Sequence, residues 1–367
     1  MMKIAFIGGR DIYKLGGIET YMFNLCTKLV QYGHEPIVYC ESNCNKIKYV
    51  NGFKVIYWKS PKSIYTCKIW LGLKSTLHAL FVEDGVKIFH YNAWPPSLWN
   101  WIPRLMGRKA IMMGHGLEWK HTKYSPRQQN VLKFMERITA MMNNHLIMCS
   151  DYQSEYFKKK YKRDCVTIPC AINIPERNEI DSNILEKNKL KKNGYFLYLG
   201  RLVQVKNPNY LIRAYIKSQI KDIKLVIAGS NDADPDYVKM LKDIANDYDN
   251  VIFTGAVYNN DKNTLLRNCV AFCIPSTSEG LAITLLEAMS FSKPVIASDI
   301  VGNREALGDN ALWVKVEDEE SLCKQLLFFK HNMKDLEAKG LENKVRVESM
   351  FTWDKTCQRY IDYIENI

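Results

Sequence analysis

Residues 275–290 read PSTSEGLAITLLEAMS and directly follow the apolar run AFCI. The apolar run predicts a short buried strand, Gly280 predicts a turn, and the segment LLEAMS predicts a helix. A helix that begins just after a strand leaves backbone N–H groups free at its positive end, here from Leu281 to Ile283. This strand, loop and helix therefore predict an anion site at the carboxyl end of a parallel sheet.

The sequence on both sides of this stretch alternates in the same way. In the second half, YFLYLGR, KLVIAG, NVIFTG, PVIAS and ALWV read as short buried strands between amphipathic segments such as NPNYLIRAYIKSQ. In the first half, KIAFIGG, EPIVYC, FKVIYW, KIFHYN, KAIMMGH and HLIMCS play the same part. We therefore expect an α/β protein with two Rossmann-like domains, each built on a parallel sheet, that face a cleft.

The chain of 367 residues is longer than a single hydrophobic core usually supports. Residues 175–193, PERNEIDSNILEKNKLKKN, are polar, rich in lysine and without core periodicity, as expected of a linker. We accordingly expect a first domain at 1–174, a linker at 175–193 and a second domain at 194–352, followed by a terminal segment at 353–367.

Composition restricts the class of protein. The chain is 47% hydrophobic and 25% charged, which is typical of a globular protein. We find neither a signal-peptide core nor about 18 consecutive apolar residues, and the eleven cysteines lack paired spacing, so we expect a cytoplasmic protein. Residues 1–170 carry a net charge of +14 and the rest −2. The basic half predicts an anionic partner, either a phosphorylated substrate, an anionic lipid or a nucleic acid.

Two carboxylates mark the quoted stretch. Glu279 lies in its loop and Glu287 in its helix, with seven residues between them. We expect Glu279 to face a sugar and Glu287 to accept hydrogen bonds from ribose hydroxyls. The alternative is that Glu279 caps the helix and Glu287 is a surface charge.

The run EGLAITLLEAM, followed by KPVIASDIVGNREAL, resembles family 4 of the glycosyltransferases. Retaining members of that family carry two glutamates at this spacing in the same strand, loop and helix. The resemblance implies the two-domain GT-B fold, a nucleotide-sugar donor, and a donor loop formed by Gly280, Leu281, Ala282 and Ile283. It also implies a terminal helix, from about Trp353, that crosses back onto the first domain.

Two cations follow the first strand of the second domain, in YLGRLVQVKNP. Arg201 and Lys206 would neutralise a leaving diphosphate if both enter the same crevice, or they are solvated surface charges. The resemblance assigns them to the pyrophosphate.

The first domain contributes further candidates. Gly16 and Gly17 precede a predicted helix and allow its backbone to approach a ligand closely. The resemblance implies that this loop closes on the donor phosphates or orients the acceptor, and that His115, at a strand end, contacts the transferred sugar. The segment HGLEW resembles a bacterial subgroup associated with rhamnosyl transfer in polysaccharide assembly, and Glu118 within it is a candidate acceptor contact.

The resemblance implies a retaining glycosyltransferase, and the two cations with the loop amides predict that it uses no metal ion and no cofactor. Its acceptor would be a saccharide or a lipid-linked saccharide, in bacterial surface polysaccharide biosynthesis. The segments at 54–75 and 157–163 mix lysines with aromatic residues, as either an anionic membrane surface contact or an ordinary basic face would. The alternatives in function are a nucleotide-sugar epimerase, a glycogen-synthase-like enzyme, or a non-catalytic nucleic-acid-binding protein, although no nucleic-acid motif is present.

Overall fold

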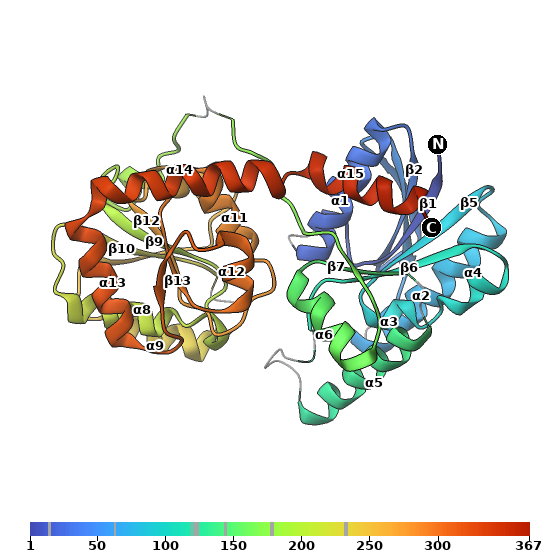
Figure 1. Ribbon diagram of the computed structural model, residues 1–367, viewed down its shortest axis with the longest axis horizontal. Helices are drawn as coiled ribbons and strands as arrows, with labels where there is room; N and C mark the ends of the chain where they lie inside the picture. Colours follow the sequence, from blue (N-terminus) through green and yellow to red (C-terminus); the bar gives the residue numbers. More distant parts are fainter. Residues whose placement is uncertain are drawn as a thin grey trace. The chain divides into compact units, whose positions relative to one another are not determined.

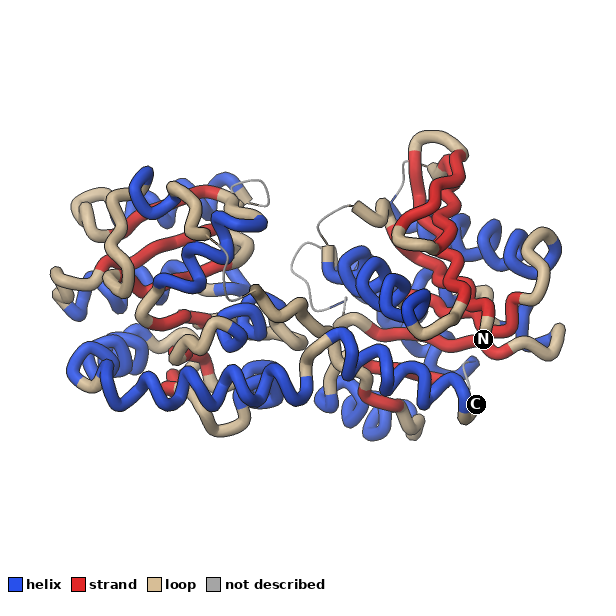
Figure 2. The backbone as a smooth tube through the Cα atoms, turned by 90° about the horizontal axis from the view of Figure 1, so that it is seen from above, coloured by secondary structure: helices blue, strands red, loops and turns tan. Residues whose placement is uncertain are grey.

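The computed structural model describes residues 1–13, 16–61, 64–117, 119, 125–142, 145–176, 180–230 and 234–367. The chain forms two compact units (Figure 1). Unit 1 comprises Met1–Ala171 and Trp353–Ile367, and unit 2 comprises Ile172–Thr352. In both units, strands and helices alternate along the chain (Figure 2).

Unit 1 contains one eight-stranded sheet in the order β3-β4-β2-β1-β5-β6-β7-β8. All neighbours pair in parallel except β3 and β4, which form an antiparallel hairpin. The strands are β1 (Lys3–Gly9), β2 (Glu35–Ser42), β3 (Lys46–Val50), β4 (Phe53–Lys59), β5 (Val86–Asn92), β6 (Lys109–Gly114), β7 (His145–Met148) and β8 (Val166–Thr167). The helices are α1 (Gly17–Gln31), α2 (Ile64–Phe81), α3 (Trp94–Ser97), α4 (Trp101–Leu105), α5 (Pro126–Met142), α6 (Asp151–Tyr161) and α15 (Trp353–Glu365).

Strand β1 shows why this sheet is covered on both faces. Ile4 and Phe6 point into a core shared with α1 and α15, whereas Ala5 and Ile7 point into a core beneath α2. Successive side chains of a strand alternate between faces, so an uninterrupted apolar run must be buried on both.

The terminal helix α15 belongs to unit 1. It buries one apolar side against the α1 face of the sheet, because its apolar residues recur at intervals of three and four. The Tyr360 hydroxyl lies 2.9 Å from His90 Nδ1, and the Thr356 hydroxyl donates to the Pro169 carbonyl at 3.0 Å. The segment after Thr352 is thereby fixed to strand β5 and to the chain that leads out of β8.

Unit 2 contains a six-stranded, wholly parallel sheet in the order β11-β10-β9-β12-β13-β14. Its strands are β9 (Tyr195–Leu199), β10 (Lys224–Ala228), β11 (Val251–Gly255), β12 (Ala271–Ile274), β13 (Val295–Ser298) and β14 (Leu312–Val314). Its helices are α7 (Ile184–Lys187), the 3₁₀ turn η2 (Gln204–Lys206), α8 (Pro208–Ser218), α9 (Pro235–Ala245), α10 (Asn259–Asn268), α11 (Ile283–Ser290), α12 (Val301–Leu307), α13 (Glu319–His331) and α14 (Met333–Met350).

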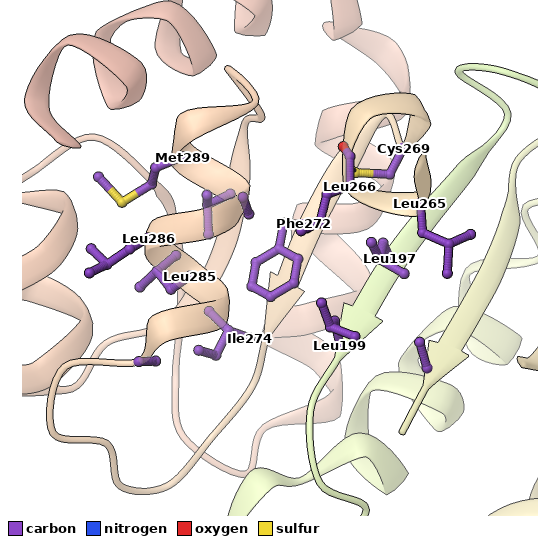
Figure 3. Close-up of a cluster of buried hydrophobic side chains, with 14 of the residues drawn as sticks. Leu197, Leu199, Leu265, Leu266, Cys269, Phe272, Ile274, Leu285, Leu286 and Met289 are labelled. Carbon is purple, nitrogen blue, oxygen red and sulfur yellow. The ribbon is translucent and has the colours of Figure 1, made fainter. Parts of the chain in front are cut away.

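The core of unit 2 positions the helix that follows β12. Phe272 of β12 lies between leucines of α11 and leucines of β9 (Figure 3). Leu285, Leu286 and Met289 form the buried side of α11 and are wholly buried. Apolar packing along its length therefore fixes the direction of α11, and with it the place where its N-terminus lies.

The segment predicted as a linker, residues 175–193, packs partly into unit 2. The contacts divide the chain after Ala171, and residues 184–190 pack into unit 2. Ile184, Leu185 and Leu190 are buried in its core, and the Asp181 carboxylate accepts a hydrogen bond from Arg267 at 2.8 Å. Three apolar residues in a lysine-rich stretch are too few to give a periodic signal, although they are enough to anchor it.

The predicted fold class is confirmed: the protein is α/β with two parallel-sheet domains of the Rossmann type. The antiparallel strand β3 was not predicted. Within the described residues, no helix combines the length and the apolar character needed to cross a bilayer.

Candidate donor site

Two loops of unit 2 meet at the carboxyl ends of β9 and β12. The Val205 carbonyl accepts hydrogen bonds from the Thr277 backbone N–H at 3.0 Å and from the Thr277 hydroxyl at 3.1 Å. Because β9 and β12 are neighbours in a parallel sheet, their carboxyl ends lie at the same edge. The loop containing Lys206 is thus tied to the loop containing Glu279.

Lys206 and Glu279 form an ion pair at this junction. The Lys206 ammonium lies 2.5 and 2.6 Å from the two oxygens of the Glu279 carboxylate, whose side chain is 8% exposed. The Ser276 hydroxyl, buried at the end of β12, donates to the same carboxylate at 2.6 Å. An ammonium has three N–H donors, so the pair leaves one of them for a further anion.

The N-terminus of α11 offers backbone donors beside this pair. Its N-cap, Ala282, makes no side-chain capping hydrogen bond. Across the described part of the chain, no acceptor faces the backbone N–H groups of Gly280, Leu281, Ala282 or Ile283. Free amides at the positive end of a helix favour an anion, as the sequence predicts for this loop.

Arg201 follows β9 on the same edge. Its carbonyl accepts a hydrogen bond from the Tyr198 hydroxyl at 2.8 Å, which fixes the backbone of the turn. Its guanidinium is exposed and makes no ion pair or hydrogen bond with any described residue. Arg201 and Lys206 therefore emerge from one turn, the first unpaired and the second paired with Glu279.

Two glycines allow other segments to pack directly on these loops. A Cβ atom at Gly302 of α12 would lie 2.2 Å from the Gly280 carbonyl oxygen and 2.5 Å from that of Glu279. A Cβ atom at Gly229, after β10, would lie 2.1 Å from the Gly200 carbonyl oxygen. Any side chain at either position would displace the backbone that carries Glu279 or Arg201.

Glu287 lies further along α11. Its carboxylate pairs with the Lys262 ammonium of α10, and its side chain is 19% exposed. The capping alternative concerned Glu279, and no described side chain makes a capping hydrogen bond at the N-terminus of α11. The predicted contact of Glu287 with ribose hydroxyls stays a prediction.

Gly16 and Gly17, the two glycines before α1 in unit 1, differ in how much space surrounds them. A Cβ at Gly16 would lie 2.3 Å from Glu19 Oε2, whereas one at Gly17 would meet no atom within 4 Å. Buried Glu19 accepts hydrogen bonds from the Arg10 backbone N–H and from Arg10 Nε, both at 3.1 Å. Burial raises the pKa of the Glu19 carboxyl, but hydrogen bonds and charge from Arg10 outweigh it, so the pKa lies below its usual value. Gly16 thus makes room for this ion pair, and Gly17 is the open position.

His115 lies just after β6, and Asn92 at the end of the neighbouring strand β5 holds it. His115 Nε2 lies 2.9 Å from Asn92 Oδ1, and the Tyr21 ring packs edge-on against the imidazole at 5.0 Å between centroids. The Tyr21 hydroxyl is buried without a hydrogen-bond partner. A buried unpaired hydroxyl beside an oriented imidazole fits a polar ligand at this strand edge.

Buried His90 lies in the same part of unit 1. Burial and the neighbouring His115 lower the pKa of His90 to about 3, although a hydrogen bond with Asn92 acts in the opposite direction. His90 is therefore neutral near pH 7, whereas it would titrate near 6.5 in an unfolded chain.

Glu118 lies outside the described residues. Its neighbour Trp119 donates from Nε1 to the buried Glu136 carboxylate at 2.8 Å. The Tyr161 hydroxyl donates to Glu136 at 2.6 Å, and Lys160 Nζ at 3.1 Å. This network fixes Trp119 against α5 and α6.

The segments at 157–163 and 54–75, which mix lysines with aromatic residues, differ in how their side chains are held, and their contact with a membrane stays a prediction. Phe157 is fully buried, and Lys158 and Lys159 pair with Asp164 and Glu155. In the segment at 54–75, Lys74 lies over the rings of two half-buried tryptophans at 4.1 and 4.8 Å. Among the aromatic side chains whose burial the structure describes in these segments, all are at least partly buried.

The described residues contain no group of three or more His, Cys, Asp or Glu side chains placed to hold a metal ion. The site residues that the sequence did not single out are Ser276, Gly302, Gly229, Asn92 and Tyr21. Gly302 could have been found, because it is the one glycine in the quoted stretch KPVIASDIVGNREAL that follows the donor loop. The other four carry no distinctive pattern, since they act through contacts between segments far apart in sequence.

Known proteins match both halves of the chain. Residues 180–344 match the family described as Glycosyl transferases group 1, and residues 15–175 match Glycosyltransferase Family 4. O-antigen chain mannosyltransferase C from Escherichia coli is 23% identical over 244 residues, which cover 65% of this chain and 63% of that protein. The chain thus aligns with less than two thirds of that relative.

Solved structures resemble the whole chain. Sucrose-phosphate synthase from Thermosynechococcus elongatus has a TM-score of 0.84 at 18% identity, covering 100% of this chain and 99% of that one. Anabaena Alr3699/HepE in complex with UDP-glucose has a TM-score of 0.77 at 17% identity, with both chains fully covered. At such identities the likeness shows the fold. With the two family matches, it identifies the chain as a family 4-like protein with the GT-B glycosyltransferase fold.

Proposed function

We propose that this chain is a retaining, metal-independent glycosyltransferase that moves a hexose from a nucleoside diphosphate to a saccharide or lipid-linked saccharide in bacterial surface polysaccharide biosynthesis. The observation that carries the proposal is the Lys206–Glu279 ion pair beside the uncapped N-terminus of α11. The named O-antigen mannosyltransferase and the neighbour bound to UDP-glucose support the substrate class.

The proposed reaction breaks the bond between the anomeric carbon and the diphosphate oxygen, and the leaving diphosphate gains negative charge. Lys206 would donate its third N–H to it, and the unpaired Arg201 guanidinium and the free α11 amides would add further donors. The Glu279 side chain, held by Lys206 and Ser276, would accept hydrogen bonds from sugar hydroxyls. These fixed charges would take the part that a divalent ion plays in other glycosyltransferases.

Retention follows in this proposal from attack on the face that the leaving group occupies. The acceptor hydroxyl forms the new bond to the anomeric carbon while the diphosphate departs, and its proton passes to the departing phosphate oxygen. His115, held by Asn92, would contact the transferred sugar. Glu118 remains a proposed acceptor contact, and a cytoplasmic location, peripheral to the membrane, remains part of the proposal.

A panel of nucleoside diphosphate hexoses, including UDP-glucose and a mannose donor, tests the proposal by thermal stabilisation and by slow donor hydrolysis with and without EDTA. We expect one donor to stabilise the wild type, Lys206→Ala and Glu279→Ala to weaken that effect, and EDTA to have none. Lys217→Ala removes a lysine from the exposed Lys217–Glu320 pair and serves as the matched control. If no donor binds, the proposal fails.

Product analysis then separates the alternatives. A transferase needs an acceptor, an epimerase converts the donor without one, and a glycogen-synthase-like enzyme extends a glucan. Proton NMR of the product reports the anomeric configuration, and an inverted product would contradict retention.

A further inference from the structure

Two cysteines lie beside His115 at the carboxyl edge of the unit 1 sheet. Strands β6, β7 and β8 are parallel neighbours in this order, and the segments after them carry His115, Cys149 and Cys170 respectively. The Cys149 backbone N–H donates to the Gly114 carbonyl at 3.2 Å, which holds the end of β7 against the end of β6. Three side chains that are far apart in sequence are thereby gathered at one edge of the sheet.

The Cys170 sulfur is in contact with both of the other side chains. It receives a hydrogen bond from the Cys149 thiol and another from the His115 imidazole. The Cys149 sulfur also lies 3.6 Å from Oε1 of the buried Gln153 on α6, which helps to fix its position. Both cysteines are present as thiols. Two sulfur atoms in hydrogen-bond contact need only a short approach to reach the length of a disulfide bond.

The His115 imidazole is held so that it can donate to the Cys170 sulfur. Its Nε2 lies 2.9 Å from Asn92 Oδ1, an oxygen that only accepts, so Nε2 carries a proton. When Nδ1 is protonated as well, the imidazolium can donate to a Cys170 thiolate, and the opposite charges stabilise each other. A base that is oriented by a third side chain is the usual means of activating a cysteine as a nucleophile.

The surroundings of Cys170 favour its thiolate form. The hydrogen bond from Cys149 lowers the pKa of Cys170, burial opposes it, and the hydrogen bond and charge of His115 lower the pKa further, so that it lies well below that of an ordinary thiol. Burial instead raises the pKa of Cys26 and Cys40 in the neighbouring core. Because Cys170 is only partly buried, a small reagent can reach it.

The Tyr21 hydroxyl supplies an unused donor beside these side chains. It is buried and has no hydrogen-bond partner among the described residues, and its ring packs against His115. Burial, with the charges of Tyr360 and Cys170 nearby, raises the pKa of Tyr21 well above its usual value, so the hydroxyl keeps its proton. An oxygen atom bound to the Cys170 sulfur would give this buried donor an acceptor.

We propose that Cys170 is a reactive cysteine that small peroxides oxidise, and that Cys149 converts the product to a disulfide. The Cys170 thiolate attacks one peroxide oxygen, so that an S–O bond forms, the O–O bond breaks, and the leaving oxygen takes a proton from the His115 imidazolium. The Cys149 sulfur then attacks the oxidised sulfur, so that the S–S bond forms, the S–O bond breaks, and hydroxide leaves with the Cys149 proton as water. The two thiols lose two electrons, which the peroxide gains.

This inference goes beyond the proposed function and does not rest on it, because thiol oxidation is measured without donor or acceptor. The disulfide would remove the negative charge that faces His115, which is the side chain proposed to contact the transferred sugar. Oxidation would therefore change the use of the donor, and a dithiol reductant would restore it.

Alkylation of the full chain by iodoacetamide, followed by peptide mass spectrometry, tests the reactivity of Cys170. In the folded chain its rate should change by less than about threefold between pH 8 and pH 6, because the thiolate persists. The same cysteine in the urea-unfolded chain is the control, and its rate should fall about 75-fold, as the thiolate fraction of an ordinary thiol does. His115→Gln should steepen the folded profile. The proposal is overturned if the folded rate falls as steeply as the unfolded one, or if folded Cys170 is not labelled.

Oxidation by equimolar hydrogen peroxide tests the disulfide. The wild type should lose the mass of two hydrogen atoms in a Cys149–Cys170 cross-link that dithiothreitol reverses. Cys149→Ser should instead gain one oxygen atom at Cys170 and react with dimedone, which labels sulfenic acids. Cys44→Ser removes an exposed thiol and should keep the cross-link. A wild type in which peroxide oxidises Cys44 before Cys170, or in which Cys170 pairs with no particular cysteine, would contradict the proposal.

Discussion

Gly302 gives the sharpest test of how α12 supports the donor loop. In Gly302→Ala the new methyl group would lie 2.2 and 2.5 Å from the carbonyl oxygens of Gly280 and Glu279. Carbon and oxygen atoms approach comfortably to about 3.3 Å, so the loop must move by roughly 1 Å. Such overpacking costs about 1–3 kcal/mol of stability. A displacement of that size at a reacting group costs on the order of 100-fold in rate.

Gly340→Ala is the matched control for this variant. Its methyl group would lie 2.0 Å from the Ser292 carbonyl oxygen, near the opposite end of α11. Both changes replace a helical glycine, so the difference in helix propensity cancels between them. Urea unfolding should show a similar loss of stability in both variants, and donor hydrolysis should fall much further in Gly302→Ala. Equal hydrolysis rates in the two variants would refute the account of the loop.

Three other predictions concern unit 1. Because His90 is buried in its neutral form, it contributes stability that is present above pH 6.5 and is lost as the pH falls toward 3, at about 1.4 kcal/mol per pH unit. His90→Gln should therefore flatten the decline of the unfolding free energy between pH 7 and 5. An unchanged slope would contradict the assignment. Gly16→Ala should displace buried Glu19 from Arg10 and cost about 1–3 kcal/mol in a thermal unfolding assay, whereas Gly17→Ala should leave stability within about 0.5 kcal/mol of the wild type. Glu136→Ala leaves the Trp119 and Tyr161 donors without their acceptor and should lower the urea midpoint by the equivalent of about 2 kcal/mol or more, so an unchanged midpoint would show that the network is not structural.

The fold could be predicted from the sequence because its strands are continuous apolar runs between helical segments. Strand β1 is an example, since a run buried on both faces reads as apolar throughout. The segment at 184–190 was misjudged as a linker because only Ile184, Leu185 and Leu190 anchor it. A few apolar contacts among lysines leave no period that sequence alone can detect.

The part of the candidate site that lies within one short segment could be predicted from the sequence. Glu279 and the N-terminus of α11 lie in a single strand, loop and helix, so their proximity follows from local sequence. The Lys206–Glu279 pair joins residues 73 positions apart, and its bidentate geometry depends on the Thr277–Val205 hydrogen bonds.

Calorimetric titration of donor or nucleoside diphosphate into the wild type, Lys206→Ala and Lys217→Ala tests the central claim most directly. Losing a charge-assisted hydrogen bond to phosphate costs about 1.5–3 kcal/mol, so Lys206→Ala should bind roughly 10- to 100-fold more weakly, while Lys217→Ala binds like the wild type. Equal affinity of all three proteins for the same nucleotide would contradict the assignment of the donor diphosphate to the Lys206–Glu279 site.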